Sequence, residues 1–271
     1  MVKLLIAIGK TVGFFTLWGI AMIVIAFQSV REPVFIRENK AFLRLWWELL
    51  PFFGVFLATF VFMVIIEKKS VKVPILTNFG QNIVYGFVLG IVWLGSVILI
   101  LFLTGHYRLG SINYVPYFGI WLISVFINTV MQEYFIRGYL FSLFNKEYGL
   151  IIAITVTTVL FTAMHGGAFE SGIIAVINVI TMSVFVSLLL VFTKSLLAPI
   201  IVHFIWNSIG CFVLGIVSLA DDYPNLFNPV LTGNNIITGG NTKIEGSIIV
   251  LFVNIFLISF LLLMLRKSAK I

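Results

Sequence analysis

The sequence predicts an all-α polytopic membrane protein, with eight transmembrane helices in one bundle around a buried polar cavity. We expect the whole chain, residues 1–271, to form one membrane domain. Three observations predict this fold class. The composition is 61% hydrophobic and only 10% charged, whereas soluble domains contain about 25% charged residues. The mean hydropathy is +1.16. The apolar residues also fall into runs of about 20, the length that an α-helix needs to cross a bilayer.

Eight apolar segments have this length, and polar connections separate them. The first begins after Lys3, and because no small-residue cleavage site follows it, we expect a retained helix and not a signal peptide. The connections REPVFIRENK and EKKSVKVP delimit the second segment. The connection 221–246, rich in Asn, Gly and Pro, precedes the eighth and is expected to be irregular. The predicted spans are residues 4–29, 42–66, 81–104, 117–142, 149–165, 172–193, 196–219 and 246–265.

Basic residues outnumber acidic ones, 17 against 10, which is typical of loops that face anionic lipid. We expect no nucleic-acid partner, because no basic patch is interleaved with aromatic side chains. Eight spans place both termini on one side of the membrane, and that side carries ten basic residues near span ends against six on the other. We therefore expect a multi-pass protein of a bacterial cell membrane with both termini in the cytoplasm. The ten are Lys3, Lys10, Lys68, Lys69, Lys72, Lys146, Lys194, Arg266, Lys267 and Lys270, and the six are Arg31, Arg37, Lys40, Arg44, Arg108 and Lys243.

A few polar residues interrupt three of the spans. The fourth contains Gln132, Glu133 and Arg137, the fifth ends in FTAMH (161–165), and the seventh contains HFIWN (203–207). Ionisable groups inside a membrane are costly and usually functional. In each set two polar or aromatic residues lie four apart, which places them on one face of a helix.

The three sets are also expected at similar depth. We count the depth from the loop ends at Lys146, Tyr148 and Lys194, which share one side of the membrane. With a rise of about 1.5 Å per residue, Glu133 and Asn207 then lie roughly 20 Å deep, His203 about 14 Å and His165 about 25 Å. This favours one convergent polar cavity. Structural interpretations remain open at this point: Glu133 and Arg137 could be a self-neutralising ion pair, and a membrane histidine often makes only a helix–helix hydrogen bond.

The neighbours of these residues have simpler interpretations. We expect Phe161 and Trp206 to be packing residues. We expect Gly138, Gly166 and Gly167 to allow helix backbones to approach closely.

The three sets together resemble the CPBP family of intramembrane proteases, also called the Abi family, which includes the CAAX prenyl endopeptidases. The family pattern is E-E-x-x-x-R, then F-x-x-x-H, then H-x-x-x-N on later helices. This chain has Q-E-Y-F-I-R, F-T-A-M-H and H-F-I-W-N in the same order, over about residues 117–210. The eight predicted spans agree with the family fold.

The resemblance implies an endopeptidase in which an activated water attacks a peptide bond. It assigns water activation to position 132 and His165, and stabilisation of the oxyanion to His203 and Asn207. Glu133 and Arg137 would orient the helix and tune the local field. The chemistry is reasonable, because a carboxylate can act as a general base and an imidazole or amide N–H can donate to developing negative charge.

The chain departs from the family pattern at position 132, where glutamine replaces the first glutamate. An amide cannot take a proton from water as a carboxylate does. The chain could be an inactivated variant, a natural protein that binds without cutting, or an enzyme in which Glu133 acts as the base. We favour an active lineage in which this particular chain is impaired.

Two other functions and a metal site remain as alternatives. A non-catalytic immunity or regulatory protein could use the same cavity to bind a peptide, and a transporter could also carry Glu, His and Arg in its spans. The single cysteine, Cys211, excludes an internal disulfide and a cysteine-based metal site. Glu133, His165 and His203 could hold zinc, but H-E-x-x-H is absent and we expect no cofactor. The expected partners are membrane lipid and a membrane-associated peptide or prenylated, lipid-embedded protein.

Overall fold

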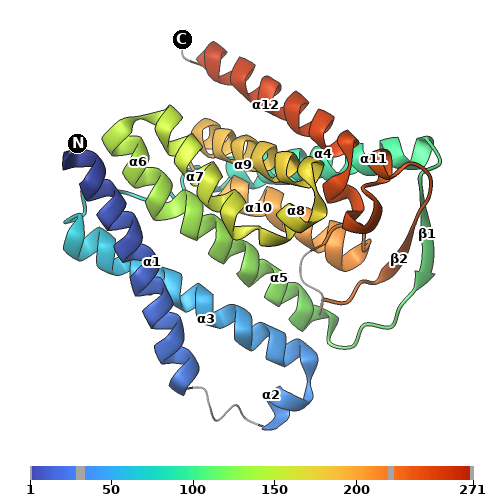
Figure 1. Cartoon of the computed structure of the whole chain (residues 1–271), viewed down its shortest axis with the longest axis horizontal. Helices are drawn as coiled ribbons and strands as arrows, with labels where there is room; N and C mark the ends of the chain where they lie inside the picture. Colours follow the sequence, from blue (N-terminus) through green and yellow to red (C-terminus); the bar gives the residue numbers. More distant parts are fainter. Residues whose placement is uncertain (1, 29–33, 219–222, 269–271) are drawn as a thin grey trace. The chain divides into compact units, whose positions relative to one another are not determined.

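A computed structural model describes residues 2–28, 34–218 and 223–268, and most of these residues are helical (Figure 1). The chain divides into two compact units, residues 1–73 with 117–153, and residues 74–116 with 154–271. Arg31 and Lys270, which contribute to the charge count, lie outside the described residues.

The described part of the first unit contains helices and the loops that connect them. It contains α1 (Val2–Gln28), α2 (Val34–Glu38), α3 (Lys40–Val61) with its π-helical continuation η1 (Phe62–Ile66), α5 (Phe118–Glu133) with its π-helical continuation η2 (Tyr134–Leu140), and α6 (Phe141–Tyr148). Helix α3 packs against both α1 and α5. The start of α7 (Leu150–Met164) also belongs to this unit.

Aromatic side chains fill the interface between α1 and its neighbours. The ring of Phe14, which is fully buried, lies 5.6 Å from Phe62, 5.4 Å from Phe135 and 4.9 Å from Tyr139 between centroids. These rings come from α1, η1 and η2, which are far apart in the sequence. Aromatic pairs at these separations stabilise beyond the area they bury.

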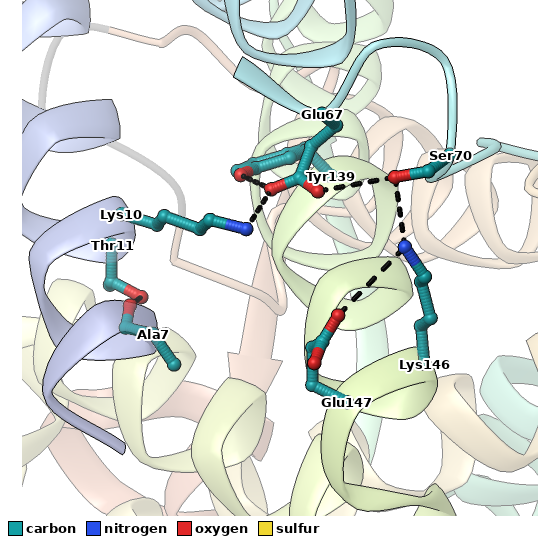
Figure 2. Close-up of polar contacts among 8 residues, drawn as sticks. All are labelled: Ala7, Lys10, Thr11, Glu67, Ser70, Tyr139, Lys146 and Glu147. Atoms are coloured by element: carbon teal, nitrogen blue, oxygen red, sulfur yellow. Dashed lines mark hydrogen bonds and ion pairs between the residues drawn. The ribbon is translucent and has the colours of Figure 1, made fainter. Parts of the chain in front are cut away.

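A polar cluster closes one end of this unit (Figure 2). The buried carboxylate of Glu67, directly after η1, lies 2.6 Å from Lys10 Nζ and accepts a hydrogen bond of 3.1 Å from the Tyr139 hydroxyl. Lys146 Nζ donates to Ser70 Oγ at 2.8 Å. The cluster therefore joins α1, the 67–74 connection, η2 and α6. As predicted, residues 67–74 form a loop.

The second unit is built around α4 (Phe79–Leu103), α9 (Ile173–Thr193), α10 (Leu197–Ile205) with its π-helical continuation η3 (Trp206–Val213), and α12 (Ile248–Ser268). It also contains most of α7 and the short helices α8 (Gly166–Ser171), α11 (Asn235–Thr238) and η4 (Gly240–Gly246). Helix α4 packs against α10 and α12, and α9 packs against α12 and α10.

Two glycines bring α4 and α10 close together. A Cβ atom at Gly86 would lie 2.7 Å from Ile201 Cβ, and one at Gly90 would lie 2.7 Å from Ile205 Cδ1. Glycines four apart are typical of closely packed membrane helices. The prediction for Gly138, Gly166 and Gly167 is wrong: the nearest described atom to a Cβ at Gly138 is at an ordinary 3.6 Å, and none lies within 4 Å at the other two.

Buried amides link three helices of this unit. Trp93 Nε1 on α4 donates to Asn254 Oδ1 on α12 at 2.7 Å, and Asn254 Nδ2 donates to Thr181 Oγ1 on α9 at 2.9 Å. Such side-chain bonds hold helices together where no water can compete.

The unit also contains a small antiparallel sheet, so the all-α prediction is wrong in this detail. Strand β1 (Tyr107–Ile112) pairs with β2 (Phe227–Leu231), with Tyr107 opposite Leu231 and Ile112 opposite Phe227. Strand β2, α11 and η4 all lie in 221–246, the connection predicted to be irregular. Burial raises the pKa of the Tyr107 hydroxyl above its usual value.

Within the residues that the structure describes, six helical segments are long and apolar enough to cross a membrane. They are Leu5–Val24, Lys40–Ile66, Phe79–Leu103, Phe118–Tyr148, Ile173–Thr193 and Gly240–Lys267. These agree with six of the predicted spans and support an integral, multi-pass membrane protein. The other two predicted spans, 149–165 and 196–219, form the shorter apolar helices Leu150–Met164 and Leu197–Val213. The count of eight spans therefore stays a prediction.

Candidate active site

The first motif lies where α5 changes into a π-helix. Gln132 and Glu133 end α5, and Arg137 lies in η2. Arg137 Nη1 donates to Glu133 Oε1 at 2.8 Å, and both side chains are completely buried. The pair at the predicted spacing of four residues is thus a buried ion pair. Single π-helical turns are rare and often occur at functional sites.

Gln132 belongs to a second polar group that the sequence analysis missed. Its Nε2 atom donates to Asn128 Oδ1 at 2.7 Å, and Asn128 Nδ2 donates to Glu48 Oε2 on α3 at 2.8 Å. Arg44 donates to the other oxygen of Glu48. The Gln132 Oε1 atom is buried and accepts no hydrogen bond from the described residues. Two signals were present in the sequence, because Arg44 precedes Glu48, and Asn128 precedes Gln132, by four residues.

The second motif surrounds the end of α7. His165 lies between α7 and α8, and its Nδ1 atom is 2.7 Å from the carbonyl oxygen of Phe161. Because a carbonyl oxygen can only accept, Nδ1 carries a proton, and in the neutral form of the ring Nε2 is the acceptor nitrogen. The turn after Met164 thus fixes the tautomer of this histidine.

Phe161 also links the second motif to the third. Its buried ring lies 4.1 Å from the ring of His165 and 6.2 Å, edge to face, from the ring of His203. His165 and His203 therefore both lie against one phenylalanine. The expectation that Phe161 is a packing residue fits these contacts.

The third motif crosses from α10 into η3. His203 and Asn207 are buried, and Asn207 follows His203 by four residues, at the start of the π-helix. Trp206 between them stacks on Trp93 of α4 with ring centroids 4.0 Å apart, as expected for a packing residue. This stacking and the glycines of α4 hold the motif in place.

The candidate residues therefore form two groups, each within one unit. Gln132, Glu133 and Arg137 share the end of α5 and the start of η2 in the first unit. The second group, His165, His203 and Asn207, belongs to the second unit. Among the described residues, no three or more His, Cys, Asp and Glu side chains are grouped as metal ligands.

The long apolar helices define an integral, multi-pass membrane protein. In the comparison with protein families, residues 114–209 match the family model described as type II CAAX prenyl endopeptidase Rce1-like. This match confirms the resemblance to the CPBP, or CAAX protease-like, family, and the matched segment contains all six candidate residues. The matched family is one of proteases, which hydrolyse peptide bonds. Comparisons with curated proteins and with solved structures gave no match.

Proposed function

We propose that the chain is an intramembrane endopeptidase of the CPBP type, impaired by the amide at position 132. Its substrate would be a membrane-associated peptide or a prenylated protein embedded in lipid. The observation that carries the proposal is the family match over residues 114–209, which covers all three motifs while position 132 carries glutamine.

The proposed chemistry needs a base, a polarised water and donors for the oxyanion. With a carboxylate at position 132, the water proton would pass to that carboxylate as the water oxygen attacks the peptide carbonyl. His165 would orient the water through Nε2, the nitrogen that the Phe161 carbonyl leaves basic. His203 and Asn207 would donate hydrogen bonds to the negative oxygen that forms. The proton would then pass to the leaving amide nitrogen.

Glu133 has a different part in this proposal. Its carboxylate is in contact with the guanidinium of Arg137 inside a fully buried pair. We therefore assign both residues to positioning the end of α5, and we assign no proton transfer to Glu133. Without a base at 132, the remaining groups could bind a peptide and polarise its carbonyl but could not activate water.

The test uses the chain, its Gln132→Glu variant, and Gln132→Glu combined with His165→Ala. Each is reconstituted in liposomes with prenylated and unprenylated membrane-tethered peptides and assayed at alkaline pH, where a carboxyl group at position 132 loses its proton. Products are identified by mass spectrometry. The proposal expects cleavage by Gln132→Glu, loss of cleavage in the double variant, and little or none by the chain as given. If no variant cuts any peptide, the proposal is wrong.

A second candidate is a non-catalytic membrane protein that binds a peptide in the same place. One observation favours it: the amide of Gln132 is already hydrogen-bonded into the α3–α5 interface through Asn128. Peptide binding by the chain and by Gln132→Glu alike, without cleavage by either, would support this candidate.

Metal independence and orientation are also part of the proposal. We propose a metal-free site, so cleavage by Gln132→Glu should survive chelation, and the purified protein should contain no stoichiometric zinc. We further propose that both termini are cytoplasmic. Cysteines introduced near each end should then react with a membrane-impermeant reagent only after the membrane is opened.

A further inference from the structure

A line of hydrogen-bonded side chains leads from α3 to position 132, and the three motifs do not account for it. It runs from Arg44 to Glu48 on α3, then to Asn128 and Gln132 on α5. Glu48 and Asn128 are 3% and 8% exposed, so the line is shielded from solvent. Helix α3 lies outside the segment that matches the protease family.

The direction of every hydrogen bond in this line follows from chemistry. Arg44 is always charged and forms an ion pair with Glu48, and the oxygens of an ionised carboxylate can only accept hydrogen bonds. Asn128 must therefore turn its NH₂ group toward Glu48, at 2.8 Å, and its carbonyl oxygen toward position 132, at 2.7 Å. That oxygen can only accept, so it requires a donor from residue 132.

Glutamine meets this requirement, and an ionised glutamate does not. The Gln132 NH₂ group donates to Asn128. The Gln132 carbonyl oxygen is buried and accepts no hydrogen bond from the described residues. A carboxylate at 132 would place negative charge against the Asn128 oxygen. A protonated carboxyl group would donate to that oxygen as the amide does.

We propose that Glu48, acting through Asn128, is a positioning residue that fixes position 132 as a hydrogen-bond donor. The surroundings of position 132 are then adapted to an amide or a protonated acid. The catalytic meaning of this inference rests on the proposed protease function, but the hydrogen-bond geometry stands without it.

The other ion pairs of the first unit do not set the direction of the Asn128 amide. On α5 and η2, Glu133 and Arg137 neutralise each other at 2.8 Å. On α1, Lys10 pairs with Glu67 beyond the end of η1. The remaining charged residue of α3, Lys40, is exposed at its first turn. Glu48 is therefore the carboxylate that sets the direction of the Asn128 amide.

The test measures protonation and requires no cleavage. Infrared difference spectra of Gln132→Glu minus the unchanged chain, at neutral pH in liposomes, report the carbonyl stretch of a protonated carboxylic acid. The inference expects this band in Gln132→Glu and its loss in Gln132→Glu with Glu48→Gln, because Asn128 can then turn over and donate to the carboxylate. The matched control is Gln132→Glu with Glu67→Gln, another buried acid of the same unit, which should retain the band.

Three results would overturn the inference: no band in Gln132→Glu, a band that persists with Glu48→Gln, or a band lost equally with Glu67→Gln. If Glu48→Gln does not fold, Glu48→Ala in the Gln132→Glu background also removes the carboxylate that orients Asn128 and should also remove the band. Absence of proteolysis in every variant would refute the proposed function and leave these spectra as a separate result.

Discussion

Replacing Arg137 by methionine tests whether the buried ion pair of the first motif stabilises the helix end. Methionine keeps much of the apolar volume but leaves the Glu133 carboxylate without its guanidinium partner. At the observed 2.8 Å, the Coulomb attraction is about 6 kcal/mol for an effective dielectric constant of about 20. Part of this offsets the cost of burying both charges, so we expect the single change to lower the free energy of unfolding by about 3–5 kcal/mol.

The assay is reversible unfolding in mixed micelles, followed by circular dichroism, on a double-mutant cycle. Glu133→Gln with Arg137→Met removes both charges, and the double variant should recover a large part of the loss, because no unpaired charge stays buried. A cost below about 1 kcal/mol for Arg137→Met, or a double variant as unstable as the sum of the single changes, would refute the reasoning.

Three further changes test the packing. Gly90→Ala should be about 1–3 kcal/mol less stable than Gly95→Ala, since overpacking is costly and only the Cβ at Gly90 meets the facing helix. Tyr139→Phe should cost about 2 kcal/mol, as it removes a hydrogen bond to the Glu67 carboxylate. Asn254→Leu should cost about 1–3 kcal/mol by leaving the buried indole N–H of α4 without an acceptor. Melting in micelles measures all three, and unchanged stability would contradict each.

The six long helices could be predicted because hydropathy is a local signal that each segment carries by itself. The seventh segment is shorter than predicted for the same reason, because the apolar run 196–219 continues beyond Val213, where the helix has already ended. Composition does not reveal this stop, since residues such as Ile216 and Val217 are buried outside a helix.

Contacts between residues far apart in the sequence could not be predicted. Strand β1 pairs with β2 more than a hundred residues later, and neither alternates clearly in the sequence. Similarly, Gly86 and Gly90 are the glycines that let α4 approach α10. Close approach depends on the facing side chain and not on the glycine alone.

In the candidate site, too, contacts within one helix could be predicted and contacts between helices could not. The pair Glu133–Arg137 follows from spacing within one helix, and the structure contains it. The link from Glu48 to Asn128 joins two helices 80 positions apart. Spacing could suggest Arg44 with Glu48 and Asn128 with Gln132, but only the packing of α3 on α5 connects these pairs.

We expect that an amide at position 132 silences a protease. The rate of peptide cleavage by Gln132→Glu, relative to the unchanged chain, tests this most directly. Both are assayed in liposomes with an internally quenched, membrane-tethered peptide, at alkaline pH, where carboxyl groups lose their proton. A general base contributes about 10²–10⁴ to the rate, so the account predicts a gain of at least about 100-fold. The gain should disappear with His165→Ala. Equal rates for the two chains, or a gain that survives His165→Ala, would contradict the account.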